Sequence, residues 1–267
     1  MFICFNGSIH PSSAAVLSAQ NSSFKYGDGC FETIKVLRED IQLASLHFER
    51  LFLTMEVLKI EHTPELNETN FAEQILHLCR LNDVSESARV RLAVFRGVNN
   101  SAEYLIEALP LDAEFHKWNE KGLVIDIFPD GRKSCDALSN LKTANFLIYI
   151  LAAIHAQEKG LDDCVVLNSE NNLCDTSKAN IFLIKDENIF TPALHQGCIN
   201  GVMRRHVIDG LKTAGFQVYQ KEINERDLLN ADEVFVTNAI IGVRWVQRFK
   251  EKDYTCSLSR KLYAKLL

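Results

Sequence analysis

Lys142 is the residue of this chain whose type and position point most directly to chemistry. It lies at the head of a stretch, residues 143–157, that contains no Lys, Arg, Asp or Glu, and this stretch predicts a buried helix over residues 141–159. Loss of hydration around an amine lowers its pKa, so Lys142 would be available to form an imine with a carbonyl compound. The alternative is a lysine that only caps or solubilises the start of the helix.

Residues 197–205 form a second candidate site. A glycine-bearing turn there opens a predicted helix, so the backbone N–H groups of Gly201, Val202 and Met203 are placed to hold a phosphate. Arg50 could bind the same phosphate, or it could pair with a neighbouring acid on its own helix. An amine and a phosphate site together would suit a phosphorylated carbonyl cofactor.

Other catalytic motifs are incomplete. Gly27-Asp28-Gly29 has the first two glycines of a dinucleotide-binding fingerprint, but it lacks the third and leads into a predicted strand. Gly197-Cys198-Ile199-Asn200-Gly201 has the outline of a nucleophile elbow, but the isoleucine at its centre cannot attack a substrate. The eight histidines show no HxxxH or HExxH spacing, so we expect no metal site.

Composition limits the possible partners and location. The 267 residues include 29 Lys and Arg against 35 Asp and Glu, a formal net charge of −6, which makes nucleic acid and anionic membranes poor partners. The eight cysteines form no CxxC pair and are expected to be reduced thiols. The N-terminus lacks the features of a signal peptide, and the uncharged stretch is shorter than the ~20 residues that cross a bilayer. We therefore expect a cytoplasmic protein.

Hydrophobic periodicity predicts an α/β (α+β) fold in two domains. Apolar residues alternate with Arg89 and Arg91 over residues 88–94, as in a half-buried strand. Asn6-Gly7 predicts a hairpin turn, and the polar, proline-bearing stretch before residue 123 predicts a linker. The expected domains are residues 1–112 and 123–267, with a linker over 113–122. The expected strands are residues 30–36, 89–95, 103–108, 123–128, 164–168 paired with 180–184, 216–223 and 233–237, and the expected helices are residues 45–60, 64–81, 141–159, one from 201 and one at the C-terminus.

A series of short motifs follows one order along nearly the whole chain, from about residue 5 to residue 247. The motifs are Tyr26-Gly27-Asp28-Gly29-Cys30-Phe31-Glu32-Thr33, His47-x-x-Arg50-Leu51, Asn140-Leu141-Lys142, Asn180-Ile181-Phe182, Thr191-Pro192, Gly201-Val202-Met203-Arg204 and Ala231-Asp232-Glu233-Val234-Phe235. This series resembles the class IV pyridoxal-phosphate enzymes, which include branched-chain and D-amino-acid aminotransferases and 4-amino-4-deoxychorismate lyase. The resemblance implies a two-domain fold-type IV architecture with pyridoxal 5'-phosphate in the cleft between the domains, and a homodimer.

The resemblance also assigns roles to the residues around the cofactor's carbonyl and phosphate. It implies that Lys142 forms the Schiff base with the cofactor and later moves the proton. It implies that Arg50 and the backbone of residues 201–203 hold the phosphate, and that the side chain of Asn238 lies beside it.

One carboxylate departs from the family's pattern. Asp175 lies five residues before Asn180, where the family has glutamate, and the resemblance implies that it pairs with the pyridine nitrogen. Such a carboxylate keeps the ring protonated, which makes the ring an electron sink. Aspartate is one methylene shorter, so Glu170, in a predicted turn, is the alternative residue for this role.

The resemblance implies Phe31 and Arg96 as substrate-facing residues. Arg96 could instead pair at the end of its strand. After Arg96-Gly97 family members often supply a second arginine for a substrate carboxylate, whereas this chain has Val98-Asn99-Asn100.

Within the family, the segments around Lys142, Gly201 and Asn238 are closest to 4-amino-4-deoxychorismate lyase. The implied reaction converts the small-molecule amine aminodeoxychorismate into p-aminobenzoate and pyruvate, a step of folate biosynthesis, with Lys142 taking the proton from the carbon that bears the amine nitrogen. The alternatives are a class IV aminotransferase acting on branched-chain or D-amino acids, and a non-catalytic binding module on the same fold.

Overall fold

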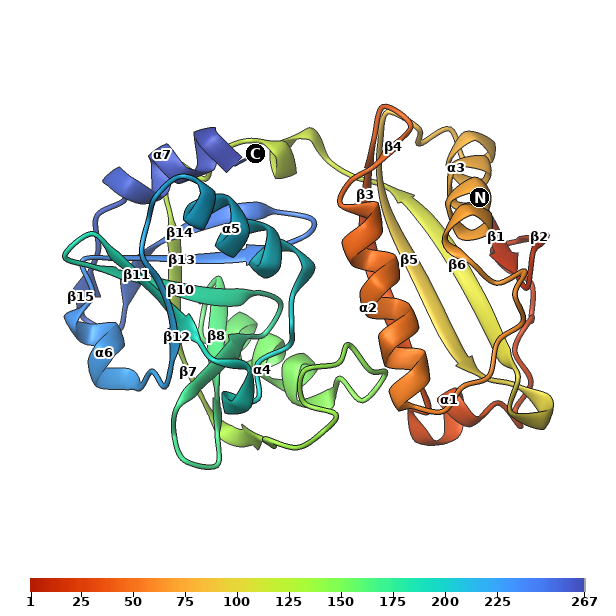
Figure 1. The fold of residues 1–267 in the computed structure, drawn as a ribbon, viewed down its shortest axis with the longest axis horizontal. Coiled ribbons are helices and arrows are strands. Elements are labelled where there is room, and N and C mark those ends of the chain that lie inside the picture. Colours follow the sequence, from red (N-terminus) through yellow and green to blue (C-terminus); the bar gives the residue numbers. More distant parts are fainter. Residues whose placement is uncertain (267) are drawn as a thin grey trace. The chain divides into compact units, whose positions relative to one another are not determined.

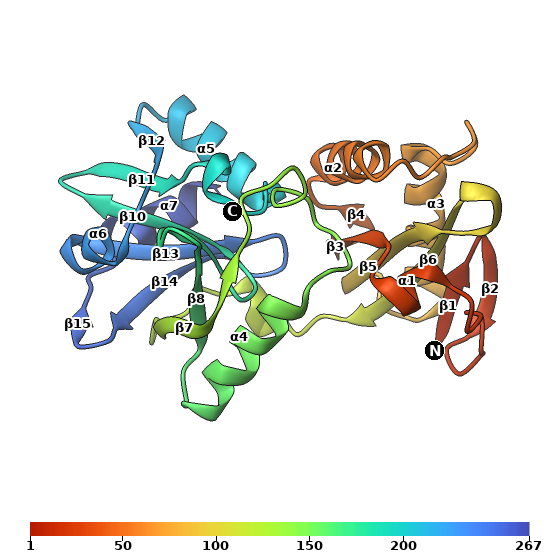
Figure 2. The same cartoon turned by 90° about the horizontal axis from the view of Figure 1, so that it is seen from below.

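The chain forms two compact units in the computed structural model, which describes residues 1–266 (Figures 1 and 2). The first unit contains residues 1–115 together with residues 141–145, and the second contains the rest of the described chain. The division expected from the sequence places residues 141–145 in the C-terminal part. Their contacts place them in the first unit, because the Phe31 N–H donates to the Lys142 carbonyl oxygen (3.0 Å) and the Ala144 N–H donates to that of Gly29 (2.8 Å).

The first unit is an antiparallel sheet with helices packed against it. Its elements are β1 (Phe2–Phe5), β2 (Ser8–Pro11), α1 (Ser22–Tyr26), β3 (Gly29–Leu37), β4 (Asp40–Ile41), α2 (Ala44–Val57), α3 (Glu68–Leu81), β5 (Ser87–Arg96), η1 (Val98–Asn100) and β6 (Ala102–Pro110), with η2 (Ala113–His116) at its end. The strands follow the order β2-β1-β6-β5-β3-β4. The helices α2 and α3 share one apolar core with the sheet (Figure 1).

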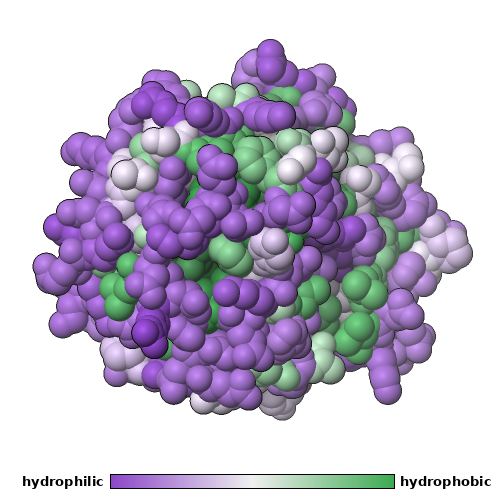
Figure 3. All heavy atoms as spheres, turned by 60° about the vertical axis from the view of Figure 1, so that its left-hand side comes forward, coloured by the Kyte–Doolittle hydropathy of each residue, from purple (hydrophilic) through white to green (hydrophobic). Residues whose placement is uncertain are grey.

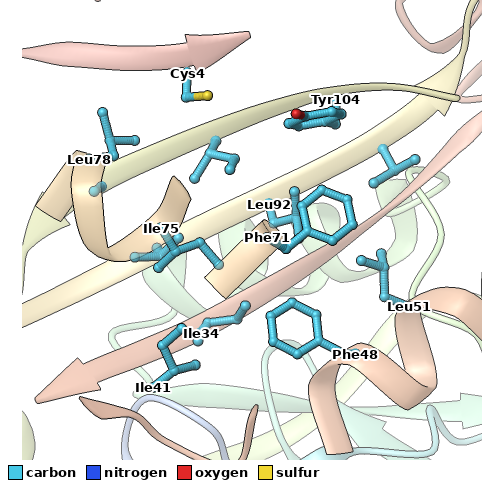
Figure 4. Packing of buried hydrophobic residues seen from close by; sticks show 14 of the residues in the cluster. Cys4, Ile34, Ile41, Phe48, Leu51, Phe71, Ile75, Leu78, Leu92 and Tyr104 are labelled. Carbon is cyan, nitrogen blue, oxygen red and sulfur yellow. The ribbon is translucent and has the colours of Figure 1, made fainter. Parts of the chain in front are cut away.

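Residue alternation builds this core. Every second side chain of β3 and β5 is buried in it, including those of Ile34 and Val90, because successive side chains of a strand point to opposite faces. The helices contribute Phe48 and Phe71, whose ring centroids lie 6.2 Å apart. Figure 4 shows both rings in the core. Asn6-Gly7 joins β1 to β2 with both residues at positive φ, which confirms the predicted hairpin turn.

The second unit is a mixed sheet with helices around it. Its elements are β7 (Leu123–Lys133), α4 (Leu147–Glu158), β8 (Asp163–Asn168), β9 (Leu173–Thr176), β10 (Asn180–Lys185), β11 (Asn188–Pro192), η3 (Leu194–Gln196), α5 (Val202–Thr213), β12 (Val218–Lys221), α6 (Glu225–Asn230), β13 (Glu233–Asn238), β14 (Gly242–Phe249), β15 (Lys252–Asp253) and α7 (Ser257–Leu266). The strands follow the order β12-β11-β10-β13-β14-β7-β8-β9, and β15 pairs with β14. The helix α4 packs on β7 and β8 (Figure 2), and the end strand β9 also contacts β10, so the sheet curls.

One expectation about this unit is wrong, and some of its strands were not predicted. Residues 164–168 and 180–184 do form strands, but they do not pair with each other: β8 pairs with β7 and β9, and β10 pairs with β11 and β13. The strands β9, β11 and β14 were not expected from the sequence, and the four residues of β9 form neither an apolar–polar alternation nor a continuous apolar run.

The surface carries both polar and apolar side chains. The face drawn in Figure 3 is mainly hydrophilic, with hydrophobic residues gathered in smaller patches. Within residues 1–266, no helix combines the length and the apolar character needed to cross a membrane.

Candidate active site

Lys142 lies in an extended segment beside β3. The neighbouring Thr143 forms a β-bridge with Cys30, and α4 begins only at Leu147. The predicted helix start at residue 141 is therefore wrong, because the backbone of residues 142–144 pairs with β3 instead of with a following helical turn. The Lys142 Nζ atom lies 4.6 Å from the centroid of the Phe31 ring, so a buried aromatic face orients the amine.

Arg91 contacts the same aromatic ring. Its guanidinium carbon lies 4.0 Å from the Phe31 ring centroid, and burial lowers the pKa of Arg91 while the Glu107 charge opposes this shift. The outer face of the first sheet thus brings an amine, an aromatic ring and a guanidinium together. In the sequence, Arg91 stands out only as a polar position in an alternating strand, and this alternation places it on the face opposite the core. A guanidinium beside a reactive amine can bind a substrate carboxylate.

Arg50 is paired with a buried carboxylate. Its Nε and Nη2 atoms donate to the two oxygens of Glu32 at 2.7 and 2.5 Å, and Nδ1 of His47 lies 2.7 Å from Oε2 of the same carboxylate. Burial by itself would raise the pKa of Glu32, but the Arg50 charge and the hydrogen bonds from His47 and Arg50 outweigh burial and lower the pKa to about 2. This acid lies on β3 and not on α2, the helix that carries Arg50. In the sequence, Glu32 and His47 appear only as members of motifs, with no role assigned to them.

Arg96 uses its whole guanidinium group within the first unit. Nε and Nη2 donate to the Asp28 carboxylate at 2.7 and 3.1 Å. Nη2 and Nη1 also donate to the carbonyl oxygens of Leu58 (2.7 Å) and Lys59 (2.9 Å), and Nη1 donates to the side-chain oxygen of Asn100. These bonds engage all five N–H groups of an arginine. The geometry therefore supports pairing at the strand end and leaves no N–H group for a substrate.

Asp175 is buried in the second unit among hydrogen-bond donors. Oδ1 accepts from Asn180 Nδ2 at 2.7 Å, and Oδ2 accepts from the Tyr149 hydroxyl at 2.7 Å and the Ile199 N–H at 2.9 Å. The Lys133 ammonium lies 3.5 Å from Oδ2. Burial, reinforced by the Asp175 charge, raises the pKa of Tyr149 well above its ordinary value, so this hydroxyl remains a donor.

The alternative carboxylate, Glu170, lies in quite different surroundings. It is exposed in a turn, and its N–H donates to the Asn168 side-chain oxygen at 3.0 Å. The environment of Asp175 is the one suited to binding a cationic ring nitrogen. Neither Lys133 nor Tyr149 belongs to one of the sequence motifs, so neither was predicted as a neighbour of Asp175.

The N-terminus of α5 offers backbone donors. Its N-cap residue, Gly201, makes no side-chain capping bond, and a Cβ atom there would lie 1.9 Å from Asn180 Oδ1. The Gly201 N–H donates to the Ile199 carbonyl oxygen at 2.8 Å. Of the three amides considered for the phosphate, those of Val202 and Met203 are therefore the ones in the first helical turn without an intrahelical acceptor. Asn180 connects this turn to Asp175, because its Nδ2 also donates to the Ile199 carbonyl oxygen.

Asn238 shapes the turn after β13. Its Oδ1 accepts from the N–H groups of residues 240 and 241, both at 2.9 Å, and its Nδ2 donates to the Lys178 carbonyl oxygen at 2.9 Å. The adjacent Thr237 is fully buried, and its hydroxyl has no partner among the described residues. Thr237 on β13 pairs in register with Asn180 on β10. Its hydroxyl group therefore lies on the strand next to Asn180, which donates to Asp175.

Known proteins are similar to this chain in sequence and in fold. The family model described as amino-transferase class IV matches residues 29–249. The aminodeoxychorismate lyase of Vibrio harveyi is 30% identical over 230 residues, which cover 83% of each chain, and that of Bacillus subtilis is 27% identical over 269 residues, which cover 94% of this chain and 88% of the relative. The structure of a branched-chain aminotransferase from Thermoproteus uzoniensis superposes with a TM-score of 0.88 at 21% identity, over 99% of this chain and 92% of that one.

Proposed function

Because the chain belongs to the class IV aminotransferase family of enzymes, we propose that it is a 4-amino-4-deoxychorismate lyase that releases p-aminobenzoate and pyruvate. The observation that carries the proposal is the cluster of Lys142, Phe31 and Arg91 on the first sheet, which supplies an amine and a cation for an anionic substrate. The identity to lyases of two bacteria supports this choice within the family.

Pyridoxal 5'-phosphate is the cofactor of this family, and the residues present fit it. The amides of Val202 and Met203 at the start of α5 suit a phosphate, because a helix N-terminus attracts negative charge. The backbone at Gly201 has no room for a side chain. Asp175 suits a pyridine nitrogen that carries a proton, and Lys142 supplies the amine for the carbonyl. When bound, the cofactor supplies an electron sink for the carbon that loses its proton.

Each residue then has a definite task. Lys142 would hold the carbonyl carbon of the cofactor through Nζ and, as a free amine, would use the same atom to take the proton from the substrate carbon. Arg91 binds a substrate carboxylate, and Phe31 orients both cations through its ring face. Arg50 would supply positive charge for the phosphate, and Glu32 fixes the orientation of its guanidinium.

Pyruvate release tests the proposal. Cofactor-loaded protein mixed with aminodeoxychorismate should give pyruvate and p-aminobenzoate in equal amounts, and Lys142→Ala should lower the rate by at least about a thousandfold. Lys212→Ala, an exposed position of α5, is the matched control and should keep the wild-type rate. In parallel, D-alanine, L-leucine and L-glutamate without a keto acid should leave the cofactor's absorption band unchanged.

An aminotransferase acting on branched-chain or D-amino acids is the second candidate. The description of the matching family favours it, as does the segment Val98-Asn99-Asn100, where a second arginine is missing. It would use the same Lys142 and differ only in where the proton is returned. Rapid conversion of the cofactor band by one of the three amino acids, without pyruvate release, would identify this activity and contradict the lyase.

A homodimer in the cytoplasm completes the proposal. All eight cysteines are unpaired, as expected of a reducing compartment. One face of α4 carries apolar side chains that are at least 46% exposed: Leu147, Ile150, Leu151 and Ile154. Their spacing makes a continuous stripe, which supports α4 as the contact with a second copy. Ile150→Glu combined with Ile154→Glu should convert a dimer into a monomer in light scattering, and an unchanged mass would exclude this interface.

A further inference from the structure

Asp175 is bound asymmetrically by its neighbours. Its Oδ2 faces the Tyr149 hydroxyl at 2.7 Å, the Ile199 N–H at 2.9 Å and the Lys133 ammonium at 3.5 Å. Among the described residues, Oδ1 accepts only from Asn180 Nδ2, at 2.7 Å. A carboxylate oxygen has about two lone-pair sites. Oδ2 is therefore fully used, and Oδ1 can accept from one more donor.

Lys133 supplies Asp175 with a positive partner from this chain itself. Its side chain is 9% exposed at the end of β7. Its Nζ also donates to the Ser139 carbonyl oxygen at 2.8 Å and lies 5.1 Å from the Tyr149 ring centroid, and these contacts fix the ammonium beside Oδ2. A buried carboxylate that already has one cation attracts a second cation less strongly than an uncompensated carboxylate does.

The other titratable groups that interact with Asp175 keep one charge state near neutral pH. Burial, followed by the Asp175 charge, raises the pKa values of Tyr149, Cys174 and Cys198, so these groups stay neutral. Burial lowers the pKa of Arg204 while the nearby Cys198 and Asp175 oppose this shift, and a guanidinium remains charged in proteins. A proton exchanged at this site near neutral pH therefore does not belong to any of these four groups.

We propose that Lys133 and Tyr149 are positioning residues that hold Asp175 through Oδ2 and present Oδ1 to the ring nitrogen of the cofactor, and that the Lys133 charge weakens the hold of Asp175 on the proton of that nitrogen. This inference rests on the proposed function, since it takes Asp175 as the partner of the ring nitrogen. It explains how a carboxylate one methylene shorter than glutamate is kept in a fixed orientation. It also makes the ring nitrogen lose its proton at a lower pH than beside an uncompensated carboxylate.

Pyridoxine 5'-phosphate labelled with nitrogen-15 in its ring is the probe for this inference. It has an alcohol in place of the aldehyde, so it binds without reacting with Lys142, and the nitrogen-15 resonance reports whether the ring nitrogen carries a proton. Lys133→Met should raise the pH of deprotonation by at least about one unit, a tenfold change in the equilibrium. Lys133→Arg should restore the wild-type titration because it keeps the charge, and Lys212→Met, at an exposed position, should leave it unchanged.

Tyr149→Phe tests the positioning part separately. Loss of a hydrogen bond to a charged oxygen frees the carboxylate to rotate, so we expect the affinity for pyridoxine 5'-phosphate to fall about tenfold. Tyr219→Phe, at an exposed tyrosine stacked on Phe190, is the control and should bind as the wild type does. The thermal midpoint of each variant, measured beside the affinity, identifies a variant that binds poorly because it fails to fold.

The outcomes separate this inference from the proposed function. If the wild-type protein binds the probe and the titration in Lys133→Met is unchanged or moves to lower pH, the role of Lys133 is overturned while the cofactor site stands. If Tyr149→Phe binds with unaltered affinity, the role of Tyr149 is overturned. If the wild-type protein does not bind the probe at all, the cofactor site fails and both proposals fall.

Discussion

Glu32 in the first unit and Asp175 in the second are both buried carboxylates beside a cation, but their partners differ in kind. Arg50 meets Glu32 with two N–H groups, one on each oxygen, and His47 adds a third contact. Asp175 has an ammonium at 3.5 Å, and its close donors are a hydroxyl and two amide groups without charge.

This difference separates an ion pair that engages both carboxylate oxygens from a carboxylate that suits the binding role proposed for Asp175. A bidentate guanidinium satisfies both oxygens in directed geometry, so Glu32 orders Arg50 and has both of its oxygens engaged. Asp175 keeps an acceptor position on Oδ1 and is compensated only through the other oxygen. Substitutions at Glu32 should therefore act mainly on stability, and substitutions at Asp175 mainly on cofactor chemistry.

Asp175→Asn should have its main effect on activity. The amide cannot hold a proton on the ring nitrogen as a carboxylate does, so pyruvate release should fall by about a hundredfold to a thousandfold. The unfolding free energy should fall less than in Glu32→Gln, because Lys133 keeps the Ser139 carbonyl oxygen as an acceptor. Steady-state pyruvate release and urea unfolding measure the two quantities. A rate near that of the wild type would remove Asp175 from the chemistry.

Glu32→Gln should cost about 3 to 5 kcal/mol of unfolding free energy, because it removes the carboxylate charge that faces the buried Arg50 guanidinium. Urea unfolding followed by circular dichroism measures the loss, and hydrogen exchange at the amides of α2 and β3 locates it in the first unit. Glu56→Gln, at an exposed position of α2, the helix that carries Arg50, is the control and should change stability by less than about 0.5 kcal/mol. Equal stabilities of the two variants would contradict the structural role of Glu32.

The same pair predicts a loss of stability in acid. The folded-state pKa of Glu32, about 2, lies below its ordinary value of 4.5, so the folded protein binds this proton less readily than the unfolded chain does. The contribution, on the order of 3 kcal/mol, is fully present above about pH 4.5 and is lost as the pH falls toward 2. The difference in unfolding free energy between the wild type and Glu32→Gln should shrink over this window, and a constant difference would contradict the depressed pKa.

Removal of a helix cap should give the smallest loss of unfolding free energy among these variants. One cap in each unit serves as a reference for the other substitutions. Asn67 Oδ1 accepts from the Asn70 N–H at 3.1 Å at the start of α3, and Asn224 forms a capping box at the start of α6. Asn67→Ala and Asn224→Ala should each lower the unfolding free energy by about 1 kcal/mol and leave pyruvate release unchanged. A loss as large as that of Glu32→Gln would show that the buried Glu32–Arg50 pair contributes no more to stability than a helix cap.

The sequence alone singled out the residues that we propose for the chemistry. The resemblance in motif order pointed to Lys142, Asp175 and the turn at residues 201–203, and alternation located the strands that became β3 and β5. Such local signals work because a strand or a helix fixes the direction of its own side chains. They failed for the helix before Leu147, where backbone pairing with β3 took the place of local helical bonds.

The tertiary structure decided which partners these residues have. Arg50 meets Glu32, 18 positions away, and Lys133 meets Asp175, 42 positions away. Arg96 donates its N–H groups to Asp28 and to the carbonyl oxygens of the two residues that follow α2. Hydrogen bonds require atoms within about 3.5 Å in a narrow range of angles. Such distances depend on strand order, register and packing, so residue types and spacing determine what the chain can do, and only the folded chain determines which groups do it together.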